Sequence, residues 1–239
     1  MRKFYFIFLS CLLGASTVHA QTSSAKYSLL LKGGHIIDPK NNINQTMDLA
    51  ISDGKVAAVE KNIDPKLAER VVDVKGLYVT PGLVDLHAHV FAGTDGRSYS
   101  DGSSAVAPDG FTFRAGVTTV VDCGGAGWRS FDRFKENIID RSQTRVLSFL
   151  NIVGAGMKGE STFEQNIEDM DSRKADSTAR KYPEHIVGFK LAHFRAADWT
   201  PVERVIQAGK LSDKPVIVDF GGDNSHEPLS LRTLFTKYF

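Results

Sequence analysis

The stretch Val79-Thr80-Pro81-Gly82-Leu83-Val84-Asp85-Leu86-His87-Ala88-His89 decides how this chain is interpreted, because two histidines close an apolar segment. The apolar residues indicate a buried strand, and Pro81-Gly82 marks its beginning. Side chains at positions i and i+2 share one face of a strand, so His87 and His89 point to the same place. Neutral imidazoles in that arrangement are typical metal ligands. The alternative is a pair of histidines that end a core strand and bond to the backbone.

Downstream of this stretch, apolar strands alternate with helical segments. The expected strands cover residues 83–89, 117–123, 145–153, 186–191 and 215–220. The expected helices follow Ser130, run from a Ser161/Glu164 capping box to Pro183, begin at a Thr200/Glu203 capping box, and cover residues 230–239. Such alternation predicts a parallel α/β fold, because each crossover connection needs a dozen or more residues.

Upstream, residues 27–80 predict a small β-sandwich-like domain. Its expected strands cover residues 27–32, 35–38, 47–51, 55–60 and 71–74. Asp53-Gly54 lies between the third and fourth of these strands and is a strong signal for a two-residue hairpin turn. These strands are too few and too short to form a large core of their own.

Residues 1–20 predict a removable signal peptide. Arg2 and Lys3 form the basic start, residues 4–13 are apolar, and Val18-His19-Ala20 forms a cleavage signal. The apolar run is shorter than the roughly 20 residues that span a bilayer. We therefore expect a periplasmic or secreted protein with no membrane span after processing. Lipid attachment at Cys11 is the alternative.

Charge and cysteine content narrow the class of protein. Without Arg2 and Lys3, 27 basic residues face 28 acidic ones, and this near-neutral balance argues against nucleic acid as a partner. Cys123 is then the one remaining cysteine, so no internal disulfide is expected.

The number of strands predicts an incomplete barrel. A closed (β/α) barrel has eight strands and about 250 residues, whereas five strands and 157 residues follow from Leu83 onward. An open sheet would leave an apolar strand edge exposed. We therefore expect residues 81–239 to form a (β/α) TIM-type barrel truncated after about five strands.

Several motifs together resemble the amidohydrolase superfamily on its dihydroorotase side. They are Lys32-Gly33-Gly34-His35-Ile36-Ile37-Asp38-Pro39, Asp53-Gly54-Lys55-Val56 and the histidine stretch quoted first. Within that superfamily, residues 110–122, 149–157 and 187–190 resemble the amidohydrolase/deacetylase group. The resemblance runs in order from about Tyr27 to about Leu234 and covers only the N-terminal portion of such an enzyme.

This resemblance implies one or two zinc ions at the carboxyl ends of the barrel strands. It makes His87 and His89 the metal ligands of the first strand and Lys190 an N-carboxylated bridging ligand. An unmodified lysine is a cation that cannot bind metal, whereas its carbamate is an anionic oxygen donor. Without the resemblance, Lys190 would be interpreted as a solvated or salt-bridged lysine. Manganese, iron and nickel are alternatives to zinc.

Four further residues are candidates for the same site. They are Asp122, His193, Asp219 and His226, which follow or end the second, fourth and fifth expected strands. For the two aspartates, a capping or loop hydrogen bond is the favoured alternative. Where related dihydroorotases carry a fifth-strand histidine, this chain has Val218-Asp219-Phe220-Gly221, which puts that ligand in doubt. His35 and His185 are expected to lie at the surface or in turns.

The resemblance further implies metal-dependent hydrolysis of an amide-type C–N bond, as in a deacetylase or a cyclic-amide hydrolase. The family takes its general base from an aspartate on the eighth strand, which is expected beyond residue 239, so the activity is expected to be impaired. A non-catalytic remnant is the competing interpretation. The expected partners are a small amide substrate and either a second copy or a complementing C-terminal half.

Overall fold

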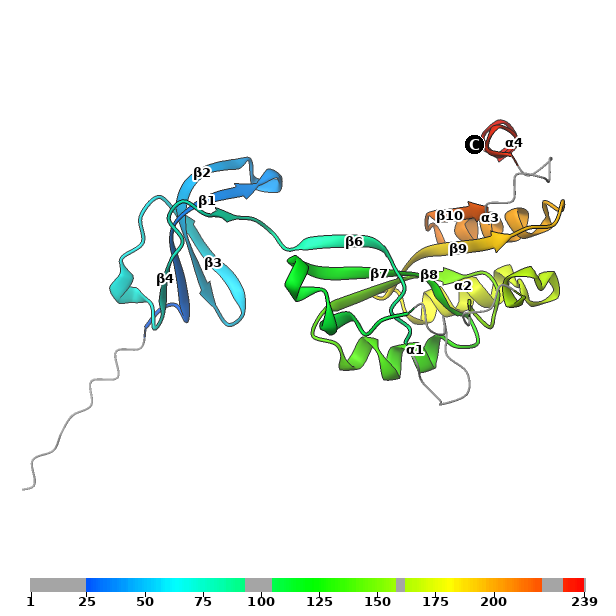
Figure 1. Ribbon diagram of the computed structural model, residues 1–239, viewed down its shortest axis with the longest axis horizontal. Helices are drawn as coiled ribbons and strands as arrows, with labels where there is room; N and C mark the ends of the chain where they lie inside the picture. The colour runs from blue at the N-terminus through cyan, green and yellow to red at the C-terminus, as the bar shows by residue number, and fades with distance from the viewer. Residues whose placement is uncertain (1–24, 93–104, 158–161, 221–229, 239) are drawn as a thin grey trace, which may run out of the picture. The chain divides into compact units, whose positions relative to one another are not determined.

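The computed structural model describes residues 25–92, 105–157, 162–220 and 230–238, which form two compact units divided after Pro81 (Figure 1). The predicted signal peptide lies outside the described residues, as do Ser161 and His226. In the part of the chain that is described, no helix combines the length and the apolar character that a membrane crossing requires.

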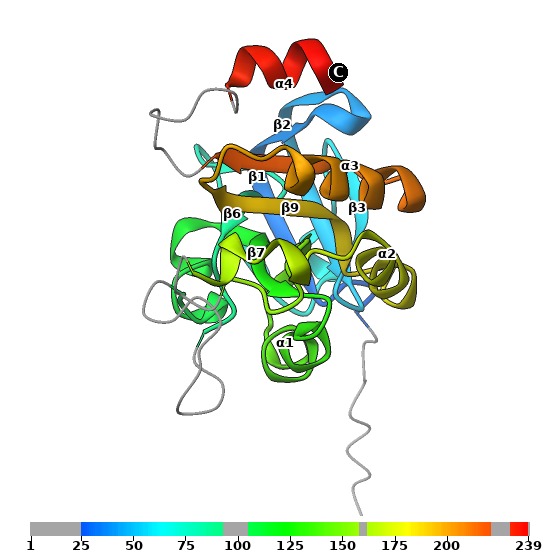
Figure 2. The same cartoon turned by 90° about the vertical axis from the view of Figure 1, so that its right-hand side faces the viewer.

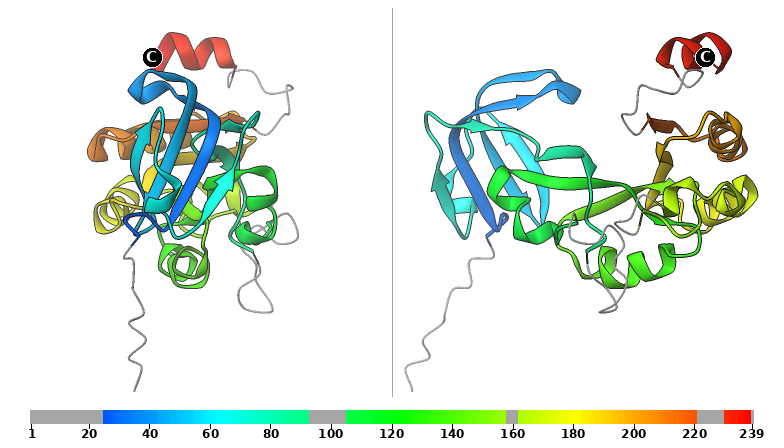
Figure 3. Two further views of the ribbon diagram at one scale, coloured as in Figure 1. Left: turned by 90° about the vertical axis from the view of Figure 1, so that its left-hand side faces the viewer. Right: turned by 45° about the vertical axis from the view of Figure 1, so that its right-hand side comes forward.

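The first unit is a mixed five-stranded sheet, shown in two further views in Figure 3. Its strands are β1 (Leu29–Asp38), β2 (Ile43–Ser52), β3 (Lys55–Glu60), β4 (Val71–Asp73) and β5 (Tyr78–Val79). β2 pairs antiparallel with β1 and β3, while β4 and β5 pair parallel with β1. The buried side chains of Tyr27, Leu30, Ala50 and Ile63 form its small core.

Two local features of this sheet follow from glycine. The expected break between residues 32 and 35 is wrong, because β1 runs through it as one strand with a register shift between Leu31 and Gly34. Gly33 adopts φ 75° at this irregularity, which a glycine tolerates without steric cost. The expected hairpin is confirmed, since Asp53 (φ 52°) and Gly54 (φ 70°) supply the two positive φ angles of a type I′ turn.

The second unit is a curled parallel sheet in the order β10-β9-β8-β7-β6, with helices on its outer side (Figure 2). Its strands are β6 (Leu83–Ala88), β7 (Val117–Gly127), β8 (Arg145–Asn151), β9 (Ile186–Phe194) and β10 (Val216–Phe220). Its helices are α1 (Phe131–Asn137), α2 (Ser172–Lys181), α3 (Thr200–Ser212) and α4 (Leu231–Tyr238). Contacts join α1 to β7, α2 to β8 and β9, and α3 to β9 and β10. The expected α/β alternation is confirmed, and the sheet corresponds to half of a barrel.

Short 3₁₀ helices connect these elements. They span Pro39–Asn41, Pro65–Leu67, Pro108–Gly110, Phe113–Ala115, Ile139–Arg141, Phe163–Gln165 and Ile167–Asp169. Two of them replace the first half of the helix expected to run as far as Pro183, so that prediction is wrong. Glu164 is buried instead of capping a helix. α2 begins after Asp171, whose carboxylate accepts hydrogen bonds from the Arg173 and Lys174 amides at 3.0 Å. At α3, Thr200 is already the first helical residue and Trp199 is the N-cap.

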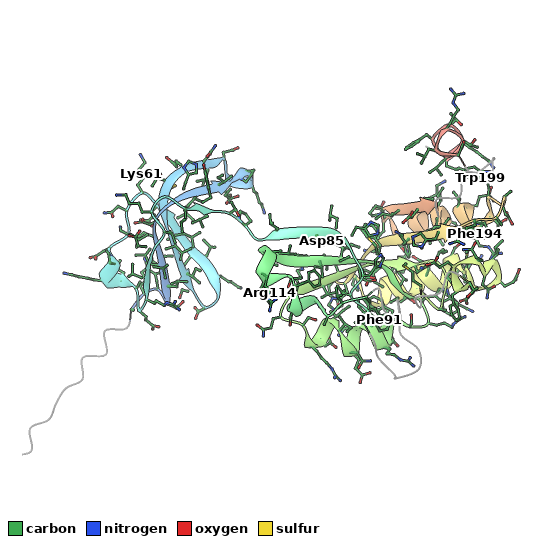
Figure 4. All side chains as sticks on the ribbon, viewed as in Figure 1. Lys61, Asp85, Phe91, Arg114, Phe194 and Trp199 are labelled. Atoms are coloured by element: carbon green, nitrogen blue, oxygen red, sulfur yellow. The ribbon has the colours of Figure 1, made fainter. Side chains whose placement is uncertain are left out.

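The core of the second unit lies between the sheet and its helices. Phe91, Phe131 and Phe134 are fully buried, and the Phe91 and Phe134 ring centroids are 4.8 Å apart (Figure 4 labels Phe91). Strand β7, which lies between β6 and β8, is buried continuously from Val120 to Gly127.

The edge strand β6 differs from the central strands. Leu83, Val84 and Leu86 are 55–65 % exposed, so the expectation that β6 is a buried strand is wrong. The physical reason is that β6 pairs only with β7 among the described strands and has no neighbour on its other side. Apolar side chains on an open strand edge are an association surface.

Asp48 is expected to make the stability of the first unit depend on pH. Its buried carboxylate accepts hydrogen bonds from Lys32 Nζ at 2.6 Å and from the Gly33 and Ile63 amides at 2.8 Å. Burial alone would raise the pKa of Asp48, but these donors outweigh it and hold the pKa below its usual value. Its stabilising contribution is therefore complete above the unfolded pKa of about 3.9 and is lost as the pH falls through the lower folded value.

The substitution Asp48→Asn should lower the free energy of unfolding of this unit by about 2–3 kcal/mol near neutral pH and flatten its acid dependence. Urea titrations at neutral and acidic pH, followed by hydrogen exchange in peptides from β1 and β2, measure this. Asp53→Asn is the matched control, because asparagine tolerates the left-handed backbone of that turn. An unchanged acid dependence in Asp48→Asn would contradict the assignment.

Candidate metal centre

The two histidines of the opening stretch lie together at the carboxyl end of β6. Their ring centroids are 5.4 Å apart and their planes meet at 76°. Figure 4 labels Asp85 on the same strand, and its carboxylate accepts a hydrogen bond from the His87 amide at 3.0 Å. The strand geometry thus brings the two imidazoles into contact, as their spacing predicts.

The surroundings of His87 favour its neutral form. Burial, the positive charge of Lys190 and the neighbouring His89 together lower the pKa of His87. An imidazole that stays neutral keeps a nitrogen lone pair, which metal coordination requires. The electrostatic environment therefore favours the neutral imidazole of His87, which can bind a metal ion, over the protonated imidazole, which cannot.

Lys190 lies on β9 with a fully buried side chain. Its Nζ is 3.1 Å from Asp219 Oδ2 on β10, and the two strands pair in a register that sets Asp219 opposite Ala192. Lys190 and Ala192 share one face of β9, so the carboxylate is directed to the ammonium group. In the structure, Lys190 forms an ion pair with Asp219.

His193 and Glu164 extend this pair. His193 Nδ1 is 3.1 Å from Glu164 Oε2, and His193 Nε2 is 3.4 Å from Asp219 Oδ2. Sequence reasoning gave Glu164 a capping role and did not place it in the site. Glu164 is only 3 % exposed, so its carboxylate needs polar partners within the protein. Nothing in the neighbouring sequence indicates that this glutamate is buried.

Asp122, in the middle of β7, is a structural hydrogen-bond acceptor. Its fully buried carboxylate accepts hydrogen bonds from the amides of Val90 at 2.8 Å, Phe91 at 3.3 Å and Gly125 at 2.7 Å. It thereby fixes the segment that directly follows His89. This arrangement matches the loop hydrogen bonding favoured from the sequence.

Gly124 allows Lys190 and Asn151 to approach the end of β7. It adopts φ 93°, and a Cβ there would lie 3.0 Å from Lys190 Cγ and 3.2 Å from Asn151 Nδ2. Asn151 Nδ2 donates to the Gly124 carbonyl oxygen at 3.1 Å. The glycine is therefore explained by the packing of Lys190 as well as by its backbone angle.

The two other histidines that lie within the described residues, His35 and His185, have local partners. His35 Nε2 lies 2.7 Å from Asn44 Oδ1 on the first sheet. His185 Nε2 lies 3.3 Å from Glu184 Oε1, in the turn before β9. Neither contact involves the cluster at His87.

The donor set fits a metal ion only in part. His87 and His89 suit a divalent ion, because both are imidazoles on one strand face and His87 is held neutral. In the described part of the chain, no three histidine, cysteine, aspartate or glutamate residues are grouped closely enough to hold one ion. Lys190 does not fit as a ligand in its present form, since its amine is an ion-paired cation.

Comparison with known proteins identifies similar sequences and a similar solved structure. The chain is 33 % identical over 176 residues to a deacetylase of Agrobacterium fabrum, an alignment that covers 71 % of this chain and 41 % of the relative. It is 38 % identical over 88 residues to a dihydroorotase of Sulfurihydrogenibium sp., covering 35 % of this chain and 20 % of the relative. A crystal structure of a dihydroorotase matches with a TM-score of 0.66 and 29 % identity, covering 80 % of this chain and 50 % of that one.

No family model matches the chain. The chain spans less than half the length of the deacetylase. The three similarities confirm the resemblance that the sequence motifs predict.

Proposed function

We propose that the chain belongs to a metal-dependent hydrolase of amide-type C–N bonds, and its similarity to a deacetylase and to dihydroorotases supports this proposal. The observation that carries this proposal is the contact between two imidazoles at the carboxyl end of β6, one of them with a lowered pKa. The substrate we propose is a small amide, either an N-acyl compound or a cyclic amide. We further propose that the protein acts in the periplasm or is secreted, on the basis of residues 1–20.

His87 and His89 are the residues that would hold the ion, and imidazole donors suit zinc. When bound, such an ion polarises a carbonyl and lowers the pKa of a coordinated water. The protein's own contribution is to hold the segment that carries His87 and His89 in a fixed position. Asp122 holds the amides of Val90 and Phe91, so the end of β6 and the segment after His89 keep a fixed direction.

A second interpretation is that this unit works with a partner chain, either a second copy or a complementing half. The exposed apolar side chains on β6 favour it. Native mass spectrometry of the purified protein measures the assembly directly, and a strictly monomeric protein would rule this interpretation out.

The metal proposal is tested with His87→Ala, His89→Ala and the double variant. We expect the wild type to bind zinc. We expect each single variant to lose more than the roughly 10- to 100-fold in affinity that removing an outer-shell partner causes, because here a ligand itself is lost. Isothermal titration with zinc and elemental analysis measure binding, and hydrolysis of N-acetyl amino acids and cyclic amides measures activity.

His35→Ala is the matched control, because His35 contacts Asn44 on the first sheet. Equal zinc affinity in the wild type and the double variant would refute the centre. Hydrolysis by the zinc-free wild type at the rate of the zinc-loaded protein would refute metal dependence.

A further inference from the structure

His193 is the extra residue of a bulge at the carboxyl end of β9. Asp219 on β10 lies opposite Ala192, and the next pair along the two strands is Phe220 with Phe194. This register passes over His193. Figure 4 labels the neighbouring Phe194, whose side chain is buried. Bulges are common next to functional sites, where they redirect one side chain.

The backbone angle of His193 favours glycine at this position. Its φ is 47°, in the left-handed region that glycine occupies at low cost in bulges. A residue with a side chain is strained there, and such strain persists only where the surrounding structure fixes it. The bulge alone therefore does not explain why this position carries an imidazole ring.

Two adjacent residues of the 3₁₀ helix Phe163–Gln165 fix this segment. Gln165 Nε2 donates to the His193 carbonyl oxygen at 2.9 Å, and Gln165 Oε1 accepts from the Arg195 amide at 2.9 Å. The oxygens of the buried Glu164 carboxylate lie 3.1 and 3.2 Å from His193 Nδ1. The same short helix therefore holds both the backbone and the ring of His193.

The two ring nitrogens of His193 differ in how closely they are held. Nδ1 is within hydrogen-bond distance of both Glu164 oxygens, whereas Nε2 is 3.4 Å from Asp219 Oδ2. That separation exceeds the range of about 2.7–3.2 Å for an ordinary N–H···O hydrogen bond. The side chains of His193 and Asp219 are 36 % and 32 % exposed. Nε2 is therefore the ring nitrogen that a ligand can reach.

His193 lies at the same edge of the sheet as the candidate metal centre. His87 is at the carboxyl end of β6 and His193 is at the carboxyl end of β9, and these strands run parallel in one sheet. In barrel-type sheets, the carboxyl ends of the strands form the binding site. An amide with an N–H group offers both a donor and a carbonyl acceptor, so Nε2 can bond to it in either tautomer.

We propose that His193 binds the amide group of the substrate through Nε2, and that Glu164 and Gln165 are its positioning residues. Because the ring is fixed before the ligand arrives, little conformational freedom is lost at this contact on binding. The inference rests on the proposed function in one respect, because its ligand is the small amide named there.

The test measures binding of N-acetylglycine and of succinimide to the full chain by NMR titration, in zinc-free and zinc-loaded samples. We expect His193→Asn to weaken binding about 3- to 10-fold, the range that corresponds to one hydrogen bond. Asparagine tolerates the left-handed backbone, so the bulge should survive this change. In protein with ¹⁵N-labelled histidine, the probe should shift the resonance of His193 Nε2 more than that of Nδ1, which stays with Glu164.

The positioning role is tested with Gln165→Ala. This variant should weaken probe binding by a similar factor and speed hydrogen exchange of the Arg195 amide, because the side chain that holds both sides of His193 is lost. A merely structural role would speed exchange and leave the affinity unchanged, which would contradict the assignment. Glu164→Gln should bind the probe more tightly than Glu164→Ala, since the glutamine oxygen still accepts from Nδ1.

Gln143→Ala is the matched control, because Gln143 is exposed and precedes β8, at the opposite end of the sheet. Equal probe affinity in the wild type and His193→Asn would overturn the proposal, and so would a wild type that binds neither probe in either sample. The proposed function can fail separately. A wild type that binds no zinc and hydrolyses nothing, but whose probe affinity depends on His193, would remove the metal-dependent hydrolase and leave this binding site. Zinc-dependent hydrolysis with unchanged probe affinity in His193→Asn would do the reverse.

Discussion

Asp122→Ala is expected to lower the free energy of unfolding of the second unit by about 3–6 kcal/mol, a large share of what a domain of this size has. The substitution removes a buried carboxylate and leaves the amides of Val90, Phe91 and Gly125 without their acceptor. A buried donor without an acceptor costs about 1–3 kcal/mol, which is why one substitution has so large an effect. Urea unfolding followed by tryptophan fluorescence from Trp128 and Trp199 measures it.

The matched control is Asp140→Ala. The Asp140 side chain is 49 % exposed and pairs with Lys135, so its loss should cost no more than about 1 kcal/mol. Asp122→Ala should also weaken zinc binding, because the same amides fix the segment after His89. If the free energies of unfolding of Asp122→Ala and Asp140→Ala differed by less than about 1 kcal/mol, which is what an exposed ion pair contributes, the three hydrogen bonds would contribute little to stability.

Gly127→Ala is the second substitution with a large expected effect, about 3 kcal/mol of lost stability. A Cβ at Gly127 would lie 1.9 Å from the Val153 carbonyl oxygen and 2.6 Å from that of Gly154. Both obstacles are backbone atoms that cannot rotate away, so β7 and the segment after β8 would have to separate. Thermal and urea unfolding measure the loss, and it should appear in the unfolding rate as well as at equilibrium.

Gly110→Ala tests whether the effect comes from crowding or from glycine replacement in general. A Cβ at Gly110 meets no atom within 4 Å, and its φ is not positive. That change should be neutral or stabilise by up to about 1 kcal/mol, because alanine restricts the unfolded chain. If the two variants proved equally stable, backbone crowding at the end of β7 would be the wrong explanation.

The order of the elements could be predicted from the sequence because local signals determine it. The parallel strands show as apolar runs, and the Asp53-Gly54 turn needs two positive φ angles that these residues readily adopt. The contact between His87 and His89 could be predicted because strand geometry alone places residues i and i+2 on one face. These features depend on residues that are close in the chain.

Features that depend on distant partners could not be predicted in the same way. Leu83 belongs to an apolar run, but its exposure depends on whether another strand lies beside β6. The spacing of Glu164 from Ser161 indicates a capping box, and its actual partner, His193, could not be identified because it is 29 positions away. The contact between Lys190 and Asp219 has the same separation, and a resemblance to other proteins pointed to a different chemistry for that lysine.

The environment of Cys123 has a consequence for experiments on this protein. Burial raises the pKa of its thiol to about 11, and Sγ donates to the Leu86 carbonyl oxygen at 3.2 Å. Because only the thiolate reacts rapidly with alkylating agents and oxidants, we expect the Cys123 thiol to resist both in the folded protein. The rate at which iodoacetamide labels Cys123 therefore reports how often the half-barrel opens, which makes this thiol a built-in probe of folding.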